Sequence, residues 1–216
     1  MRTLVIIIAT FCTIGAFAQS SHKLGNEAEM KHRYSVSLPV IILPQLFEKG
    51  WKDRTHTQHI ELHVKRNLDE KNIVGVKLAT WRLFQPMGIL WWDGLTDKVK
   101  SETEFYPGYL RETGIGISYQ RMFWKGLFAT VEVLPQYKTY LDLDGNKKGN
   151  GFKLYNSFHL GYQFAFGKQK RIYIEPQIHS QFWVFDTNTP EGFKALDDKW
   201  KNYFLFEPNL YLGVKF

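Results

Sequence analysis

Hydrophobic and polar residues alternate along the C-terminal part of the chain. Counting back in twos from Phe216 gives Val214, Leu212 and Leu210, and the residues between them are mostly polar or small. A period of two predicts a β-strand with one apolar and one polar face. The same apolar register continues upstream through Pro208, Phe206 and Phe204. The chain therefore ends in a strand and not in the frayed polar tail that is usual for domains.

The same alternation predicts seven further strands. It is clearest over residues 152–166, where Phe158 and Leu160 alternate with Ser157 and His159. Pro39 and Pro44 weaken the first strand, because proline cannot donate to a sheet ladder. The other strands are expected around residues 34–42, 59–65, 74–78, 114–120, 127–133 and 172–184.

Short and long connections alternate between these strands. Residues 69–72, 125–126 and 167–170 form short turns, whereas residues 48–57, 85–110, 142–151 and 186–200 form longer segments. Together with the C-terminal strand and its final Phe216, this plan resembles that of Gram-negative outer-membrane β-barrels, which have short periplasmic turns and longer extracellular loops.

The resemblance implies an all-β fold: a closed, antiparallel, up-and-down transmembrane barrel of about eight strands in the cell outer membrane. Closure satisfies the strand edges that lipid would leave without hydrogen bonds. The alternative architecture is a secreted, lipocalin-like barrel whose apolar face turns inward around a ligand.

The N-terminus has the features of a secretory signal peptide. Arg2 precedes an apolar run, and Ala16-Phe17-Ala18 forms a cleavage pattern. We expect residues 1–18 to be removed, residues 19–32 to form a periplasmic lead-in, and residues 19–216 to form one barrel domain. A retained anchor is the alternative, but the run is shorter than the ~20 residues of a spanning helix. Cys12 is the only cysteine, so the mature chain would have no thiolate chemistry.

Composition is compatible with this fold. Mean hydropathy is -0.31, as expected when each strand shows lipid only at every second residue. Aromatic residues make up 16% of the chain, and the net charge is +7, of which Arg2 contributes one. The remaining positive balance favours contact with outer-membrane lipid and lipopolysaccharide phosphates, and we expect no nucleic-acid partner.

The polar positions of the strands would fill the barrel interior. An eight-stranded barrel is just wide enough for side chains to fill it, and isolated buried charges are costly. We therefore expect a paired, rigid polar network; a path for protons or small solutes is the alternative. The predicted members are Glu61, His63, Lys77, Glu132, Lys153, His159, Glu175, His179 and Glu207.

The interior residues include side chains of the types that bind metals or catalyse acyl transfer. His159, His179 and Glu175 lie on neighbouring strands and could surround a metal ion, but hydrogen-bonded interior histidines are the simpler interpretation, so no metal or other cofactor is expected. Small outer-membrane barrels that modify lipid A use Ser and His side chains. Here Ser157 and His159 share a face, whereas His179 and Ser180 point to opposite faces. We expect a protein that is not an enzyme, with a lipid A acyltransferase or deacylase as the alternative.

The expected extracellular loops are rich in aromatic residues. These either fold down as a lid or bind a partner, since exposed aromatic clusters mark interaction sites. The function predicted is a structural or accessory barrel that binds an envelope protein or a surface ligand. Residues 142–146 resemble a calcium loop but lack its spacing, and a hairpin turn is the better interpretation. The candidate binding residues are Trp91, Trp92, Phe105, Tyr106, Phe193 and Trp200.

Overall fold

The computed structural model describes residues 32–40, 57–87 and 105–216. The predicted signal peptide, most of the lead-in, and Trp91 and Trp92 lie outside the described residues. No helix in the described part of the chain is long and apolar enough to cross a membrane.

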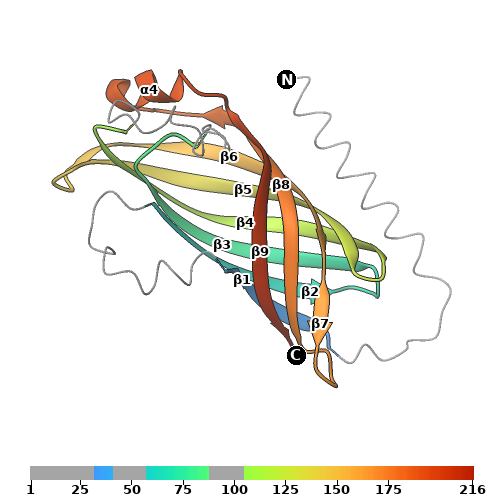
Figure 1. Cartoon of the computed structure of the whole chain (residues 1–216). Helices are drawn as coiled ribbons and strands as arrows, with labels where there is room; N and C mark the ends of the chain where they lie inside the picture. The colour runs from blue at the N-terminus through green and yellow to red at the C-terminus, as the bar shows by residue number, and fades with distance from the viewer. Residues whose placement is uncertain (1–31, 41–56, 88–104) are drawn as a thin grey trace. The chain divides into compact units, whose positions relative to one another are not determined.

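Antiparallel strands make up most of the described chain (Figure 1). One short helix, α4 (Glu191–Asp197), lies between the last two strands. The strands are β1 (Tyr34–Pro39), β2 (Gln58–Asn67), β3 (Asn72–Leu83), β4 (Gly108–Trp124), β5 (Leu127–Asp142), β6 (Lys147–Tyr162), β7 (Phe164–Phe166), β8 (Ile172–Asp186) and β9 (Tyr203–Lys215).

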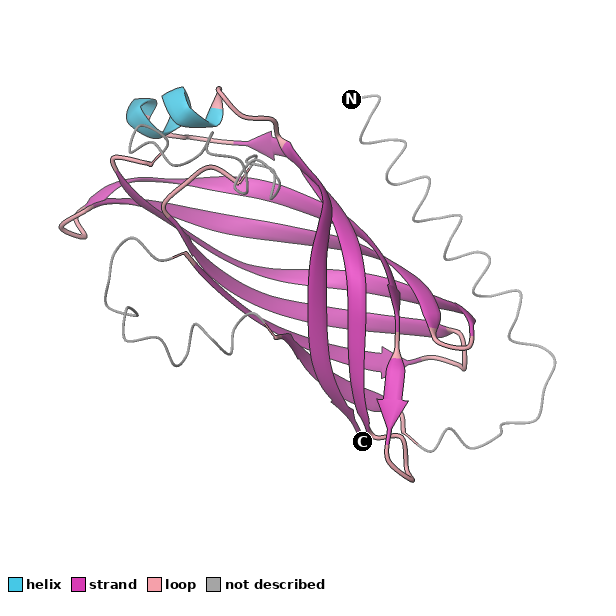
Figure 2. Cartoon of the chain, in the orientation of Figure 1, coloured by secondary structure: helices cyan, strands magenta, loops and turns pink. Residues whose placement is uncertain are grey.

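The strands close into a ring (Figure 2). Each strand from β1 to β6 pairs with its neighbour in sequence, β9 lies between β1 and β8, and the pairing of β6 with β8 closes the sheet. The short β7 continues β6 past Gln163 and pairs with β8 in the same register. The ring therefore has eight members, and the predicted closed antiparallel barrel of eight strands is confirmed.

The short turns and the C-terminus lie at one end of the barrel. The Tyr34 amide donates to the Phe216 carbonyl at 3.0 Å, next to the turn that joins β2 to β3. Lys125 and Gly126 join β4 to β5 with φ values of 45° and 107°. A two-residue hairpin with both φ positive matches strand twist, and glycine adopts it without steric cost.

At the opposite end, one predicted long loop is short. Strand β5 ends at Asp142 and β6 begins at Lys147, so only four residues connect the two strands. Asp142 Oδ1 accepts a hydrogen bond from the Asn146 amide at 2.8 Å, and Lys148 lies 2.9 Å from the same carboxylate. The segment is the hairpin turn that the sequence favoured over a calcium loop.

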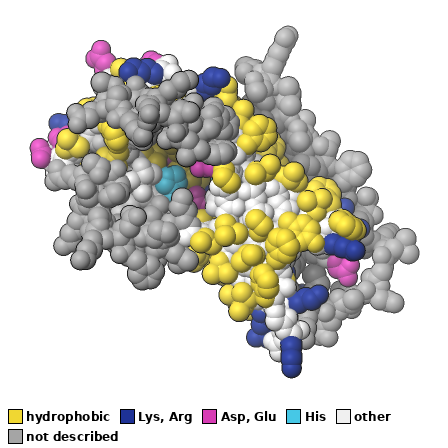
Figure 3. Space-filling view, in the orientation of Figure 1, with side chains coloured by type: hydrophobic (Ala, Val, Ile, Leu, Met, Phe, Trp, Pro, Cys, Tyr) yellow, Lys and Arg dark blue, Asp and Glu magenta, His cyan; other side chains and the backbone are white. Residues whose placement is uncertain are grey.

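The outer face of the barrel carries an apolar belt, and the inner face is polar. Ile115, Phe158 and Val214 are 64%, 54% and 48% exposed, whereas the interior side chains of Glu132 and Ser157 are 3% and 2% exposed. Hydrophobic side chains cover much of the visible wall in Figure 3. Water-soluble proteins rarely expose so much contiguous apolar surface, whereas lipid accommodates it.

This inside-out pattern reverses near the loop end. Outward positions become polar at Arg111 and Thr113, while inward positions become apolar at Leu110 and Tyr140. Because the reversal breaks the apolar-out alternation, the sequence placed the start of the fourth strand at residue 114, although β4 begins at Gly108. The strands thus continue toward the loop end as an extension that is polar outside on β4 and has its own hydrophobic core.

A bulge in β9 places Phe204 on the opposite face of the strand from the one that the sequence predicted. Phe206 adopts a left-handed φ of 55°, and the register with β8 shifts between His179 and Gln181. The extra residue turns Phe204 inward, where it is 8% exposed, although the strict alternation placed it on the apolar outer face. A bulge changes the facing of every residue beyond it.

Candidate functional site

The middle of the barrel interior is built around Lys77 on β3. Its Nζ lies 2.8 Å from Glu132 on β5 and 3.1 Å from Glu61 on β2. All three side chains are at least nine-tenths buried. One lysine therefore bridges two carboxylates on the inner face of nearby strands, in a place where an unpaired charge would be strongly unfavourable.

Glu61 is the most connected group of this network. It accepts hydrogen bonds from Trp81 Nε1 and Tyr211 Oη, both at 3.0 Å, and His63 Nε2 lies 3.3 Å away. These donors come from β2, β3 and β9, so the contacts tie the last strand to the second and third. They fix Glu61 in one position, as a structural network requires.

A second group of charges lies toward the turn end. Lys65 Nζ contacts Glu175 at 2.8 Å and donates to Gln120 at 2.9 Å. Glu175 also accepts from Gln163 at 2.8 Å and from Gln120 at 3.3 Å. Since Glu175 is fully engaged here, it does not join His159 and His179, and the described residues contain no group of three His, Cys, Asp or Glu side chains that could hold a metal ion.

A third group lies toward the loop end. Lys153 contacts Glu112 at 2.7 Å, and Lys138 contacts Asp186 and the Tyr140 hydroxyl. Tyr140 in turn shares a 2.9 Å hydrogen bond with Thr189 of the last connection. Paired charges thus occupy the interior at three heights.

The remaining predicted members form two histidine contacts side by side. His159 shares a 2.8 Å hydrogen bond with Ser157, whose hydroxyl also lies 3.5 Å from Glu132. His179 Nε2 lies 2.6 Å from Glu207, and Gln181 donates to the same carboxylate at 2.9 Å. The two imidazole rings are 5.1 Å apart.

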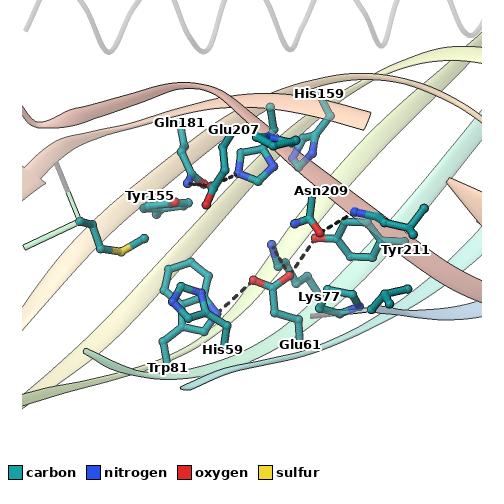
Figure 4. Close-up of a pocket in the computed structure, with 16 residues that line it drawn as sticks. His59, Glu61, Lys77, Trp81, Tyr155, His159, Gln181, Glu207, Asn209 and Tyr211 are labelled. Carbon is teal, nitrogen blue, oxygen red and sulfur yellow. Dashed lines mark hydrogen bonds and ion pairs between the residues drawn. The ribbon is translucent and has the colours of Figure 1, made fainter. Parts of the chain in front are cut away.

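These groups surround a cavity of about 390 Å³ (Figure 4). Glu61, Trp81 and Tyr211 lie on one side of it, and Glu207, Gln181 and His159 lie on the other. The lining reaches the outer face of the barrel at Pro208 and Leu210 of β9. The volume is within the range of small-molecule sites, and the lining combines aromatic and polar groups. The remaining lining residues are Pro39, Val40, His59, Lys77, Met87, Tyr155, His179 and Asn209.

Two of the predicted loop aromatics lie inside a cap at the loop end. Tyr106 and Phe193 are 5% and 3% exposed, with ring centroids 4.9 Å apart, and Phe193 also meets Tyr140 at 4.8 Å. With Leu196 they cover a buried cluster that includes Trp81, Leu83, Leu110, Leu134 and Tyr155. This is the lid arrangement, so these two rings are not on the surface.

The cap is fastened by a polar contact outside the apolar belt. The Tyr106 hydroxyl donates to Asp197 Oδ1 of α4 at 2.5 Å. Burial raises the pKa of Asp197 above its usual range, although the hydrogen bond from Tyr106 opposes this. Burial and the nearby Asp197 carboxylate raise the pKa of the Tyr106 hydroxyl. Of the other candidates, Phe105 is 39% exposed and Trp200 is half-buried.

Several interior residues were not predicted as site members. Glu112 falls in the part of β4 that the sequence assigned to a loop. Trp81 and Tyr211 are aromatic residues at interior positions, which an apolar-out pattern does not reveal. The sequence indicates their interior location only by spacing: Trp81 lies four residues after Lys77 on β3, and Tyr211 lies four residues after Glu207 on β9. Residues an even number apart on a strand share a face.

Comparison with known proteins gives similarity in structure only. No protein-family model and no curated protein sequence matches the chain significantly. Two solved structures are similar in backbone. The Yersinia pestis outer membrane protein Ail has 11% identity and a TM-score of 0.44, with 86% of this chain and 100% of that chain covered. Neisserial surface protein A has 9% identity and a TM-score of 0.42, with 85% and 95% covered.

The class of protein follows from the architecture. A closed ring of eight antiparallel strands, apolar outside and charged inside, is the fold of a small outer-membrane β-barrel. The chain is an integral barrel of the outer membrane.

Proposed function

We propose that this barrel is a non-enzymatic structural or accessory protein of the envelope, and that its loop end binds an envelope partner or surface ligand. The observation that carries this proposal is the extension beyond the apolar belt. Its exterior is polar at Arg111 and Thr113, and its interior is packed around Tyr140 and Phe193. A rigid, folded end presents a preorganised surface, which lowers the entropic cost of binding.

The ion pairs and the cap argue against conduction. Ion pairs occupy it at three heights, and the aromatic cap covers the loop end. We therefore expect no discrete conductance steps when the purified protein is added to a planar lipid bilayer. Regular steps at neutral pH would contradict a purely structural interior.

The geometry around Ser157 disfavours hydrolase chemistry. In a serine triad the imidazole bridges the serine and the acid, so that the acid stabilises the imidazolium. Here Ser157 stands between His159 and Glu132, and no hydrogen-bond partner occupies His159 Nδ1. The lipid A-modifying alternative predicts an altered lipid A mass profile in a deletion strain, restored by wild-type protein and not by Ser157→Ala. An unchanged profile would reject that alternative.

Lipopolysaccharide is the surface ligand that the exterior favours. Arg82 and Arg111 stand opposite each other on β3 and β4. The Arg82 guanidinium lies 5.4 Å and 5.8 Å from the ring centres of Phe84 and Tyr109. These two cations give this face of the barrel a positive charge, and guanidinium groups bind phosphate by charge-assisted hydrogen bonds.

The test measures lipopolysaccharide that copurifies with the barrel. Arg82→Gln with Arg111→Gln should lower the bound amount per barrel, whereas Lys194→Gln on α4, a cation with 59% side-chain exposure, should not. Native mass spectrometry after gentle extraction from the host would reveal a stoichiometric protein partner. A barrel that carries neither a partner nor lipopolysaccharide would contradict the proposed binding role.

A further inference from the structure

The turn end of the barrel carries a strong positive charge on its exterior. Nine lysines and arginines lie in or beside its turns and its terminal strands, against two acidic side chains, Asp69 and Glu70. At the loop end, residues 138–148 and 186–202 contain six basic and six acidic side chains. Figure 3 shows lysine and arginine side chains around the turn end, next to the hydrophobic wall. The nine basic residues are Arg33, Arg66, Lys71, Arg121, Lys125, Lys168, Lys170, Arg171 and Lys215.

This charge is not neutralised by neighbouring carboxylates. None of the nine forms an ion pair with an acidic side chain in the part of the chain that the structure describes. The Asp69 carboxylate is engaged within its own turn, where it accepts from the amides of Lys71 and Asn72, both at 2.8 Å, and from the Asn72 side chain at 2.6 Å. The positive potential of the turn end therefore attracts anions from outside the chain.

Arg66 and Arg121 are placed to act on one anion. Each continues the outward, apolar row of its strand at the turn end, Arg66 on β2 and Arg121 on β4. Only β3 lies between these strands, and the two arginines are opposite Val74 and Asn72 of β3. Two strand spacings of ~4.8 Å separate β2 from β4, so both long side chains can reach a group that lies over β3.

Asn72 holds the Arg121 side chain in place. Its Oδ1 accepts hydrogen bonds from Arg121 Nη1 and from the Tyr119 hydroxyl, both at 2.5 Å, and Asn72 is only 3% exposed. A guanidinium has five N–H donors, and Asn72 takes one of them. Because Arg121 is held before a ligand arrives, less side-chain entropy is lost on binding.

Aromatic rings mark the membrane boundary at this height. Tyr34 lies opposite Arg66 on β1 and stacks on Phe216, with ring centroids 6.2 Å apart. Lys125 Nζ lies 4.8 Å from the ring centre of Trp124, which is 64% exposed. Outer-membrane barrels carry aromatic girdles at both membrane interfaces. The two arginines are therefore at the depth of phospholipid head groups.

We infer that Arg66 and Arg121 bind the phosphate of an anionic phospholipid in the inner leaflet of the outer membrane. Both guanidinium groups donate to the phosphate oxygens, and an acyl chain lies along Val76 and Leu78 of β3, each 44% exposed. The apolar belt begins directly beside the two arginines, so a lipid fits this place better than a soluble anion does. This inference goes beyond the proposed function and does not depend on a partner at the loop end.

Quenching by spin-labelled lipids tests this inference. The full-length barrel with Cys12→Ser and Leu78→Cys carries a fluorophore beside the proposed acyl chain, in phosphatidylcholine vesicles at low salt. Phosphatidylglycerol and phosphatidylcholine with the same nitroxide-labelled chain are the two probes. Phosphatidylglycerol should associate at least about fivefold more strongly, which corresponds to ~1 kcal/mol for a basic residue near an anionic surface. Equal quenching by the two lipids would overturn the inference.

Salt and free phosphate distinguish a lipid from a soluble ligand. Added sodium chloride should reduce the preference for phosphatidylglycerol, because it screens exposed charges. Inorganic phosphate should reduce it no more than sodium chloride of the same ionic strength. Abolition of the preference by phosphate alone would assign the two arginines to a soluble anion and overturn the lipid assignment.

Two double variants with the same loss of charge locate the site. Arg66→Gln with Arg121→Gln should lose most of the preference for phosphatidylglycerol. Lys168→Gln with Lys170→Gln removes two exposed cations from the β7–β8 turn at the same end of the barrel and should retain it. Heat-dependent mobility on gels checks that each variant is folded. Equal losses in both variants, or an undiminished preference in the folded arginine variant, would refute the site.

Discussion

Removal of the Lys77 charge is the strongest perturbation that the interior offers. In Lys77→Met the side chain keeps a similar length, but Glu61 and Glu132 lose the cation that lies 3.1 Å and 2.8 Å away. Both carboxylates remain at least nine-tenths buried. They must then stay charged without a lysine or become protonated at neutral pH.

The size of the effect follows from burial. Removal of one partner from a buried ion pair costs about 3–5 kcal/mol, because a charge is left without compensation. Lys77 serves two carboxylates, so we expect the upper part of that range. This is a large fraction of the ~5–15 kcal/mol that stabilises a typical domain.

Urea unfolding of the refolded barrel in lipid vesicles, followed by tryptophan fluorescence, measures the loss. Adding Glu132→Gln to Lys77→Met should recover part of the stability, because one of the two uncompensated charges is removed. Lys148→Met is the matched surface control, since Lys148 contacts Asp142 at 2.9 Å with 52% of its side chain exposed; it should leave the free energy of unfolding unchanged. A loss below about 1 kcal/mol for Lys77→Met would refute the view that these charges are buried and depend on one another.

Three further predictions concern the cap and the packing of the wall. Phe193→Ala should destabilise the cap by about 3–5 kcal/mol and speed proteolysis within residues 187–202; unchanged cleavage would mean that the cap is not held by this ring. Gly213→Ala should cost about 1–3 kcal/mol in urea unfolding, because a Cβ there would lie 2.2 Å from Tyr173 Cζ, and an unaffected variant would show that the ring moves freely. The raised pKa of Asp197 means that its protonation favours the folded cap, a contribution lost as pH rises through the folded-state value. Asp197→Asn should therefore raise stability at pH 7 more than at pH 4, and equal effects at both would contradict the direction of the shift.

The alternation of apolar and polar residues predicted the barrel because, in its membrane part, outward positions are apolar and inward positions are polar. Phe158 and Ser157 differ in exposure, 54% against 2%, as a sequence period of two requires. The rule fails where its cause is absent. Toward the loop end the inward position Leu110 is apolar and the outward position Arg111 is polar, so the sequence pattern no longer marks a strand of the same kind. Phe204 was misassigned because a bulge has no signal in the alternation.

The sequence predicted which residues belong to the interior network more completely than it predicted which of them form pairs. Glu61, Lys77 and Glu132 were expected to be interior, but the contact between Lys77 and Glu132 passes over β4, which lies between their strands, and joins residues 55 positions apart. Such a contact depends on strand tilt and register, which a single sequence does not specify. From the sequence, the aromatic loop residues could either form a lid or lie on a binding surface. The packing of Phe193 against Tyr140, which only the structure shows, places Phe193 in the lid.

The most direct test of the account is which face of β6 meets lipid. Since Cys12 is the only cysteine, single-cysteine variants at positions 157 to 160 can carry a fluorophore in a Cys12→Ser background. In reconstituted vesicles, spin-labelled lipids should quench the probe at Phe158→Cys and Leu160→Cys and leave Ser157→Cys and His159→Cys largely unquenched. Equal quenching at all four positions, or quenching only at 157 and 159, would contradict a barrel with a lipid-facing apolar belt and a polar interior.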